Sequence, residues 1–223
     1  MNNRKKTYLN LETVPVGYAN GISQNFPLSD KAKEKMIKKA ASAYSKFLDA
    51  LDCDWKNDPN SADTPMRVAK SYVNDLWAGR YTPMGDITSF PSDGYDGIVI
   101  ERNVPITSMC SHHHQTIKGV VHIGYVVGDN GRVIGLSKLN RIVELFSRRG
   151  AIQEQLTVAI HNAMNLIIND NAGVAVMIDA THNCVQCRGV KHGGATMKTS
   201  KLTGAFKDDP STRNEYYEFV KGY

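Results

Sequence analysis

Hydrophobic residues recur every three or four positions in several stretches of the chain, and this spacing predicts amphipathic α-helices. Shorter runs rich in valine and isoleucine favour β-strands. The predicted helices cover residues 29–52, 64–79, 137–149, 151–168 and 210–220. The predicted strands cover residues 97–105, 118–127, 173–180, 183–190 and 196–206. This order of elements indicates an α+β fold with mainly antiparallel strands.

The ends of several elements carry recognisable signals. Ser29 and Thr64 are placed to cap the first two helices, and Gly79 can end the second. Thr212 and Glu215 have the spacing of a capping box in the last helix. After the second strand, residues 129–131 (Asp-Asn-Gly) favour a hairpin turn.

Residues 1–28 show no clear hydrophobic period and are interrupted by glycine and proline. Two interpretations stay open for them, an extended arm that contacts a neighbouring subunit and a disordered tail. The basic start of the chain is not followed by an apolar signal core, and no apolar run approaches the roughly 18 residues of a membrane span. We therefore expect a cytoplasmic protein that is not inserted in a membrane.

Composition narrows the possible partners. The 223 residues are 41% hydrophobic and 22% charged, as in ordinary globular proteins. The net charge of +5 is modest and lacks the concentrated basic stripe that non-specific nucleic-acid binding needs. It fits an anionic small molecule if the basic residues converge on one site.

Two distant stretches, residues 108–114 and 181–189, hold three of the four cysteines and four of the seven histidines. Cys110 and His113 are three positions apart, a spacing common in zinc sites. His182 and Cys184 are two apart in a predicted strand, so both side chains would share one face. By the same alternation, Gln186 and Arg188 would lie on that face, whereas Cys187 would point into the core as an unliganded thiol.

These positions give three candidate zinc ligands, Cys110, His113 and Cys184. Three protein ligands leave one coordination position open, which is typical of a catalytic zinc rather than a structural one. Three alternatives compete: a Cys110–Cys184 disulfide, a structural site closed by Cys187 or His114, and an exposed run of histidines. The missing signal sequence weighs against the disulfide, and the Cys-x-x-His spacing weighs against an exposed run. The structural site stays open as the less favoured alternative.

Further polar residues suit a nucleotide. His112 and His182 would flank the metal with imidazoles suited to proton transfer. Glu154 offers a carboxylate that could accept the paired N–H donors of guanine. The basic cluster is large enough for a triphosphate. It consists of Lys138, Arg141 and Arg188 with Ser137 at a helix N-terminus, and of Arg67 and Lys70, which could join across an interface.

Five motifs in this order resemble the GTP cyclohydrolase I family of the tunnelling-fold group. They are residues 64–70 (TPMRVAK), 109–113 (MCSHH), 135–141 (GLSKLNR), 153–157 (QEQLT) and 180–184 (ATHNC) with Arg188 and Gly189. The resemblance spans about residues 63–217 and implies an antiparallel sheet with packed helices. On this basis we divide the chain into an N-terminal arm and helix, residues 1–62, and a catalytic domain, residues 63–223.

The resemblance also implies roles for individual residues. Zn²⁺ would be held by Cys110, His113 and Cys184, with His112 and His182 catalytic. Guanine would be bound by Glu154 with Gln153 beside it. The triphosphate would be bound by Ser137, Lys138, Arg141 and Arg188, with Arg67 and Lys70 supplied by an adjacent subunit of a homo-oligomer, typically a toroidal decamer.

The expected reaction is zinc-dependent hydrolysis of GTP at C8, which yields formate and 7,8-dihydroneopterin triphosphate for pterin, tetrahydrofolate or 7-deazaguanine synthesis. The sequence departs from the family pattern at Ser111, Gln155, His114 and the glycine-rich loop 191–198. These changes affect the surroundings of the ligands rather than the ligands themselves. Two rival interpretations are a related nitrile reductase, which would use a cysteine nucleophile without zinc, and a catalytically silent GTP-binding protein.

Overall fold

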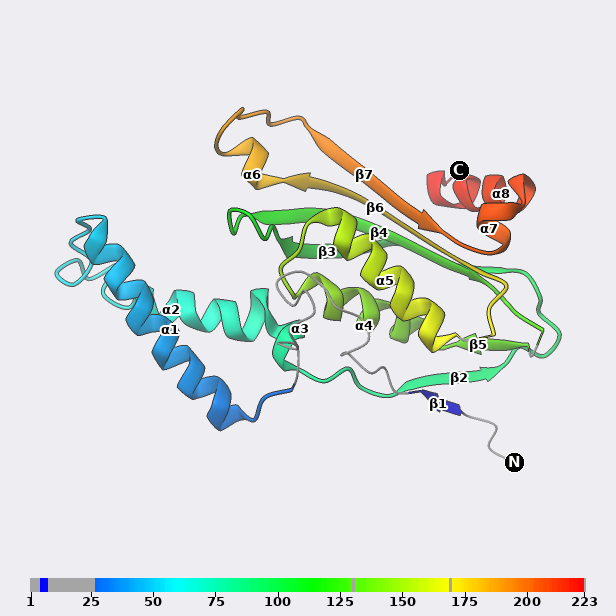
Figure 1. The fold of residues 1–223 in the computed structure, drawn as a ribbon, viewed down its shortest axis with the longest axis horizontal. Helices are drawn as coiled ribbons and strands as arrows, with labels where there is room; N and C mark the ends of the chain where they lie inside the picture. Colours follow the sequence, from blue (N-terminus) through cyan, green and yellow to red (C-terminus); the bar gives the residue numbers. More distant parts are fainter. Residues whose placement is uncertain (1–4, 8–26, 130, 169, 223) are drawn as a thin grey trace.

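A computed structural model describes residues 5–7, 27–129, 131–168 and 170–222. Its centre is a four-stranded antiparallel sheet in the order β3-β4-β6-β7, and a smaller sheet has the order β1-β2-β5 (Figure 1). The strands are β1 (Lys5–Thr7), β2 (Ile87–Pro91), β3 (Ile98–Met109), β4 (Thr116–Val126), β5 (Arg132–Ile134), β6 (Gly173–His182) and β7 (Thr196–Leu202). The expected α+β fold with antiparallel strands and packed helices is confirmed.

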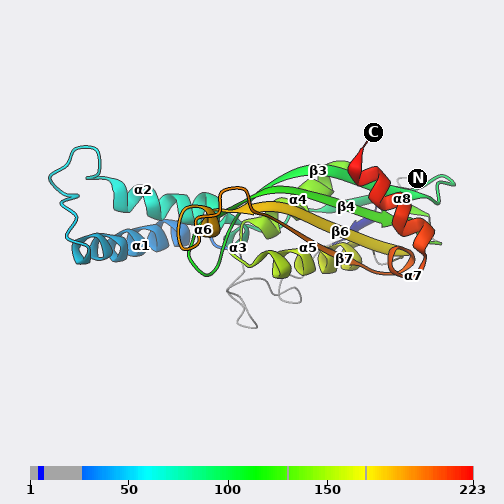
Figure 2. The ribbon, with the colours of Figure 1, turned by 90° about the horizontal axis from the view of Figure 1, so that it is seen from above.

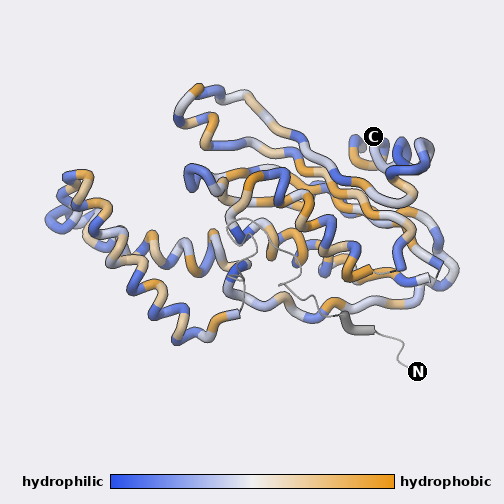
Figure 3. Tube along the Cα trace, viewed as in Figure 1, coloured by the Kyte–Doolittle hydropathy of each residue, from blue (hydrophilic) through white to orange (hydrophobic). Residues whose placement is uncertain are grey.

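Two helices, α4 (Leu136–Ser147) and α5 (Gln153–Ile167), cover one face of the four-stranded sheet. The main core lies between them and the strands, and the hydrophobic residues concentrate along these elements (Figure 3). Leu139, Ile142, Val143 and Phe146 of α4 are buried, at the three- and four-residue spacing of an amphipathic helix. Short α7 (Ala205–Asp208) and α8 (Pro210–Lys221) pack on the opposite face, as the second view shows (Figure 2).

A helical arm extends from one end of the sheet (Figure 1). It pairs α1 (Asp30–Ala50) with α2 (Thr64–Ser71), which continues through a π-helix, η3 (Tyr72–Leu76), into α3 (Ala78–Tyr81). The Ser29 cap is confirmed, because its hydroxyl accepts a hydrogen bond from the backbone of Ala32. No helix in the described part of the chain is long and apolar enough to cross a membrane.

Two predictions about the second helix were wrong. Asp63, rather than Thr64, occupies its N-cap position. Gly79 does not end the helix but lies within α3, where its backbone packs against α4. A Cβ atom at Gly79 would lie 2.0 Å from the carbonyl oxygen of Leu145. The glycine is therefore needed for close packing between two helices.

Three further predictions were wrong. The residues after His182 form a helical turn, α6 (Asn183–Gln186), in place of a strand. Strand β5 follows the predicted 129–131 turn but pairs with β2 rather than with β4, so the turn does not close a hairpin. Asn130 itself lies outside the described residues. In α8 the cap is Asp209, whose carboxylate accepts hydrogen bonds from two backbone N–H groups, and not Thr212.

The predicted extended arm at residues 1–28 lies almost entirely outside the described residues. Within it, β1 forms the edge of the small sheet, with Thr7 opposite Ile87. Further along, the backbone N–H of Leu28 donates to the carbonyl oxygen of Tyr81.

Candidate metal centre and active site

The first candidate ligands lie in the loop that joins β3 to β4. This loop is closed by two backbone hydrogen bonds, from Cys110 N–H to the Gln115 carbonyl (2.8 Å) and from His114 N–H to the Cys110 carbonyl (3.0 Å). Cys110 is buried at the end of β3, whereas His113 is exposed at the tip of the loop. The tight loop thus turns a cysteine and an imidazole three positions apart toward one place.

The third candidate ligand comes from the end of β6, which pairs with β4. The register places His182 opposite Ile117, and the Asn183 side chain donates to the Thr116 hydroxyl at 2.6 Å. The first turn of α6 then carries Cys184 toward the β3–β4 loop. The structure thus brings Cys184 to Cys110 and His113 through a helical turn, and not through the alternation along a strand that the spacing predicted.

The three ligand atoms of Cys110, His113 and Cys184 all lie within 4.8 Å of one another. A tetrahedral zinc with usual Zn–S and Zn–N bonds would set its ligand atoms about 3.3–3.8 Å apart, so the residues fit such an ion. Burial raises the pKa of the Cys184 thiol, and the neighbouring Cys110 thiol raises it further, while Arg188 opposes them. The Cys184 thiol thus favours its neutral form until a cation joins it.

His182 is held beside this group by a buried glutamine. Its Nε2 atom lies 2.7 Å from Oε1 of Gln153, which is fully buried in the first turn of α5. Burial lowers the pKa of His182, and the charge of nearby Glu154 opposes that shift. The half-buried imidazole is therefore biased toward its neutral form.

The other two histidines of the loop take different roles. His112 is exposed, with its ring centroid 6.1 Å from that of His113. His114, which sequence alone offered as a possible closing ligand of a structural site, contacts the helical arm: its Nδ1 lies 3.2 Å from the Tyr72 hydroxyl, and its ring packs edge-on against Trp77. The three histidines line one side of an apolar groove of about 740 Å³ whose other wall is the arm.

Some predicted substrate-binding residues lie near the candidate metal centre. Glu154 and Arg188 are close enough to influence His182 and Cys184, respectively, by charge. Both side chains are exposed and so remain accessible to a ligand. Gln153 is different, because its amide is enclosed by α5, β6 and β7.

Other predicted phosphate-binding residues lie at the far end of the sheet. Ser137 and Lys138 are in the first turn of α4, and Asn140 in the next turn bonds Glu101 at 2.6 Å. Glu101 pairs with Ile123, whereas Met109, next to Cys110, pairs with Thr116. The seven residue steps from Thr116 to Ile123 correspond to about 23 Å along β4. The first two turns of α4 therefore lie near the end of β3 opposite the loop that carries Cys110 and His113.

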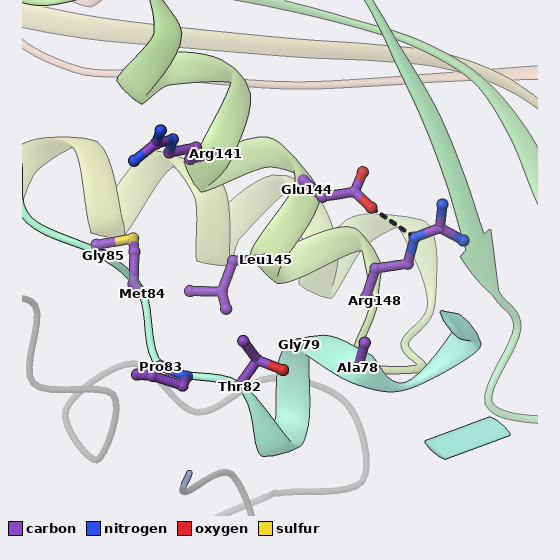
Figure 4. A pocket seen from close by; sticks show the side chains of 10 residues that line it. All are labelled: Ala78, Gly79, Thr82, Pro83, Met84, Gly85, Arg141, Glu144, Leu145 and Arg148. Atoms are coloured by element: carbon purple, nitrogen blue, oxygen red, sulfur yellow. Dashed lines mark hydrogen bonds and ion pairs between the residues drawn. The ribbon is translucent and has the colours of Figure 1, made fainter. Parts of the chain in front are cut away.

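Arg141 lines a different cavity from the groove beside the three histidines. It lines a pocket of about 240 Å³ between α4 and the chain after α3, together with Glu144 and Arg148 (Figure 4). Glu144 and Arg148 form an ion pair at 2.9 Å. Arg67 and Lys70 are exposed on α2, where Arg67 lies 3.5 Å from Asp63. One chain therefore brings together the ligands, His112, His182, Gln153, Glu154 and Arg188. Ser137 and Lys138 lie in the first turn of α4, and Arg141 lines a separate pocket. Arg67 and Lys70 flank two residues of α2, Val68 and Ala69, that line the groove shared with the three histidines.

Two features were missed in the sequence. Cys187 is exposed rather than in the core, and its thiol donates to the Asn183 carbonyl one turn before it in α6. Thr157 and Thr199, which enclose Gln153, carry no motif that distinguishes them from other threonines. The helical spacing of Gln153 and Thr157 placed them on one face, but their partner on β7 depends on strand register.

Comparisons with known proteins agree with the sequence motifs. A family model described as GTP cyclohydrolase I matches residues 40–221. The chain is 37% identical over 205 residues to GTP cyclohydrolase 1 of Sinorhizobium fredii, covering 91% of this chain and 98% of that protein. It is 40% identical over 178 residues to GTP cyclohydrolase 1 of Aeromonas salmonicida, covering 79% and 80%. A crystal structure of an archaeosine synthase QueF-like protein in its apo form is also similar, with 17% identity, a TM-score of 0.39, and coverage of 49% of this chain and 96% of that one.

Proposed function

The chain belongs to the GTP cyclohydrolase I family, and we propose that it hydrolyses GTP at C8 in a zinc-dependent reaction. Two hydrolytic steps open the imidazole ring and release C8 as formate. The ribose chain then rearranges and closes a pterin ring, giving 7,8-dihydroneopterin triphosphate. This would be the first step, in the cytoplasm, of pterin, tetrahydrofolate or 7-deazaguanine synthesis.

The observation that carries the proposal is the convergence of Cys110, His113 and Cys184 within 4.8 Å, beside His182. Two thiolates and one imidazole suit zinc and leave a coordination position open. When bound there, zinc supplies a Lewis acid that makes water nucleophilic near neutral pH.

The remaining residues of this cluster bind and orient the substrate. Glu154 accepts hydrogen bonds from guanine N1–H and the exocyclic amine, with Gln153 behind it in the same helical turn, and Arg188 contacts the phosphates. His112 and His182 exchange protons with the purine and the opened ring, because an imidazole side chain can both accept and donate a proton. The neutral bias of His182 suits it to accept a proton first.

We further propose that the triphosphate site is completed by other copies of the chain in a homo-oligomer, such as a toroidal decamer. Ser137, Lys138 and Arg141 of a second copy, and Arg67 and Lys70 of an adjacent one, would supply the missing positive charge. Support comes from the separation of about 23 Å within one chain between Glu101, which α4 contacts, and the strand end next to Cys110. It also comes from large apolar side chains that are exposed in the single chain, among them Val190 (79%), Leu136 (61%) and Phe47 (54%).

The direct test is to incubate the purified protein with GTP and measure formate and the fluorescence of oxidised neopterin phosphate, with and without a zinc chelator. We expect both products, and their loss with the chelator. His112→Ala and His182→Ala should each slow formate release by about 10²–10⁴-fold. Near-normal formate release from both variants would refute the catalytic assignment, and fluorescence that ignores the chelator would refute the zinc requirement.

A further inference from the structure

The amide of Gln153 belongs to a closed ring of hydrogen bonds. Its Nε2 atom donates to the Thr199 hydroxyl at 3.1 Å, and the hydroxyls of Thr199 and Thr157 are 2.6 Å apart. The Thr157 hydroxyl in turn donates to the backbone carbonyl of Gln153 at 2.8 Å. The ring therefore begins and ends on one residue and ties α5 to β7.

This ring can run in only one direction. A carbonyl oxygen accepts and never donates, so the single hydrogen of the Thr157 hydroxyl is used on the Gln153 carbonyl. The Thr199 hydroxyl must then donate to Thr157, and its own oxygen is left to accept from Gln153. The atom of Gln153 that faces Thr199 must therefore be the amide nitrogen.

Two backbone carbonyls impose the same orientation. The amide nitrogen of Gln153 also lies 3.2 Å from the Ile178 carbonyl oxygen and 2.9 Å from that of Met197. A flipped amide would place its oxygen against these two oxygens and lose their hydrogen bonds. Since the side chain is fully buried, no solvent compensates for that loss.

With the nitrogen so placed, Oε1 of Gln153 faces His182 Nε2 at 2.7 Å, and an amide oxygen can only accept. We propose that Gln153 is a positioning residue that holds the proton of neutral His182 on Nε2 and leaves Nδ1 as the atom that exchanges protons with the substrate. Gln153 thus acts through His182 and not by direct contact with guanine. This inference rests on the proposed function for the role of His182, but not for its tautomer.

The tautomer is measured directly by long-range ¹H–¹⁵N NMR of histidine-labelled protein, at a pH where the imidazole is neutral. The His182 signals are those lost in His182→Asn. We expect protonated Nε2 and unprotonated Nδ1 in the wild type. In Gln153→Met, which removes the acceptor, the Nδ1-protonated form should become populated, and kcat should fall about 10- to 100-fold at unchanged zinc content.

One variant separates positioning from simple packing. Thr157→Val opens the ring but keeps both carbonyl contacts of the amide, so the tautomer should stay as in the wild type. A wild-type His182 protonated on Nδ1 would overturn the proposal, and this measurement needs no variant to fold. An unchanged tautomer in Gln153→Met would overturn it as well. A wild type that fails to release formate would instead refute the proposed function and leave the tautomer assignment standing.

Discussion

The separation between Lys138 and the candidate metal centre makes a quantitative prediction about mixed oligomers. In one chain α4 contacts Glu101 of β3 through Asn140, two residues after Lys138, at a point about 23 Å along the sheet from the strand end next to Cys110. We therefore expect an active site that uses both to draw Lys138 from a second copy. His182→Ala disables the part of the site that one copy supplies, and Lys138→Ala disables the part that the other supplies. Each variant alone should therefore be strongly impaired, because every site in it carries the defect.

Mixing the two variants should restore activity. In a randomly assembled oligomer from equal amounts, half the sites receive an intact His182 and, independently, half receive an intact Lys138, so about one quarter of the sites should be complete. Co-expression of the two variants with different affinity tags, followed by two-step purification, would yield the mixed oligomers. Formate release per chain is then compared with that of the wild type treated identically.

A matched control tests the geometry rather than assembly alone. His112 and His182 both lie in the cluster that one chain supplies, so a mixture of His112→Ala and His182→Ala should recover no complete sites. Recovery in this control, or no recovery with Lys138→Ala, would refute the division of the site between chains.

Three other predictions follow from individual contacts. Cys184→Ser should reduce bound zinc from about one ion per chain to less than a tenth of that after dialysis, measured by plasma emission spectrometry; retention of zinc would contradict its assignment as a ligand. Gly79→Ala should destabilise the fold by about 1–3 kcal/mol in denaturant titrations, because the added Cβ would lie 2.0 Å from the Leu145 carbonyl oxygen. Gly193→Ala, where nothing lies within 4 Å, should be neutral. Burial lowers the pKa of His161, so the unfolded chain binds the proton first as pH falls. The free energy of unfolding should therefore decline below about pH 6.5, by up to about 1.4 kcal/mol per pH unit. If a His161→Gln variant shows the same pH slope, His161 is not the cause of the decline.

Much of the candidate site could be predicted from local spacing. The Cys-x-x-His pattern of Cys110 and His113 specifies a compact loop, and the histidine and cysteine that close the site follow a strand whose pairing with β4 brings them there. The error lay in extending that strand past His182. A valine and the alternation of side chains between two faces favour a strand locally. In the structure, the Asn183 side chain donates to the Thr116 hydroxyl, and the Asn183 carbonyl accepts the first hydrogen bond of a helical turn. Neither contact can be predicted before β4 and β6 are paired.

Other errors came from competing local signals. Asp209 and Thr212 both suit a helix N-terminus, and Pro210 at the first helical position decides for Asp209. The π-helix between α2 and α3 adds one residue to a helical turn and so shifts the hydrophobic pattern by one position. A search for a regular period of 3.6 residues does not detect such a shift. The position of Ser137 and Lys138 away from the loop that carries Cys110 and His113 could not be predicted, because it depends on the direction in which α4 runs across the sheet.

The π-helix η3 also limits which changes in chain length the protein can tolerate. It presents the Tyr72 hydroxyl to His114 and sets Trp77 against the same ring. Each residue of an α-helix adds about 100° of rotation, so deleting one position within residues 72–76 would turn one aromatic contact away from the loop that carries Cys110 and His113. In a library of single-residue deletions, this segment should be depleted among active clones. The loop at the opposite end of the arm, residues 53–62, should instead accept both deletions and insertions.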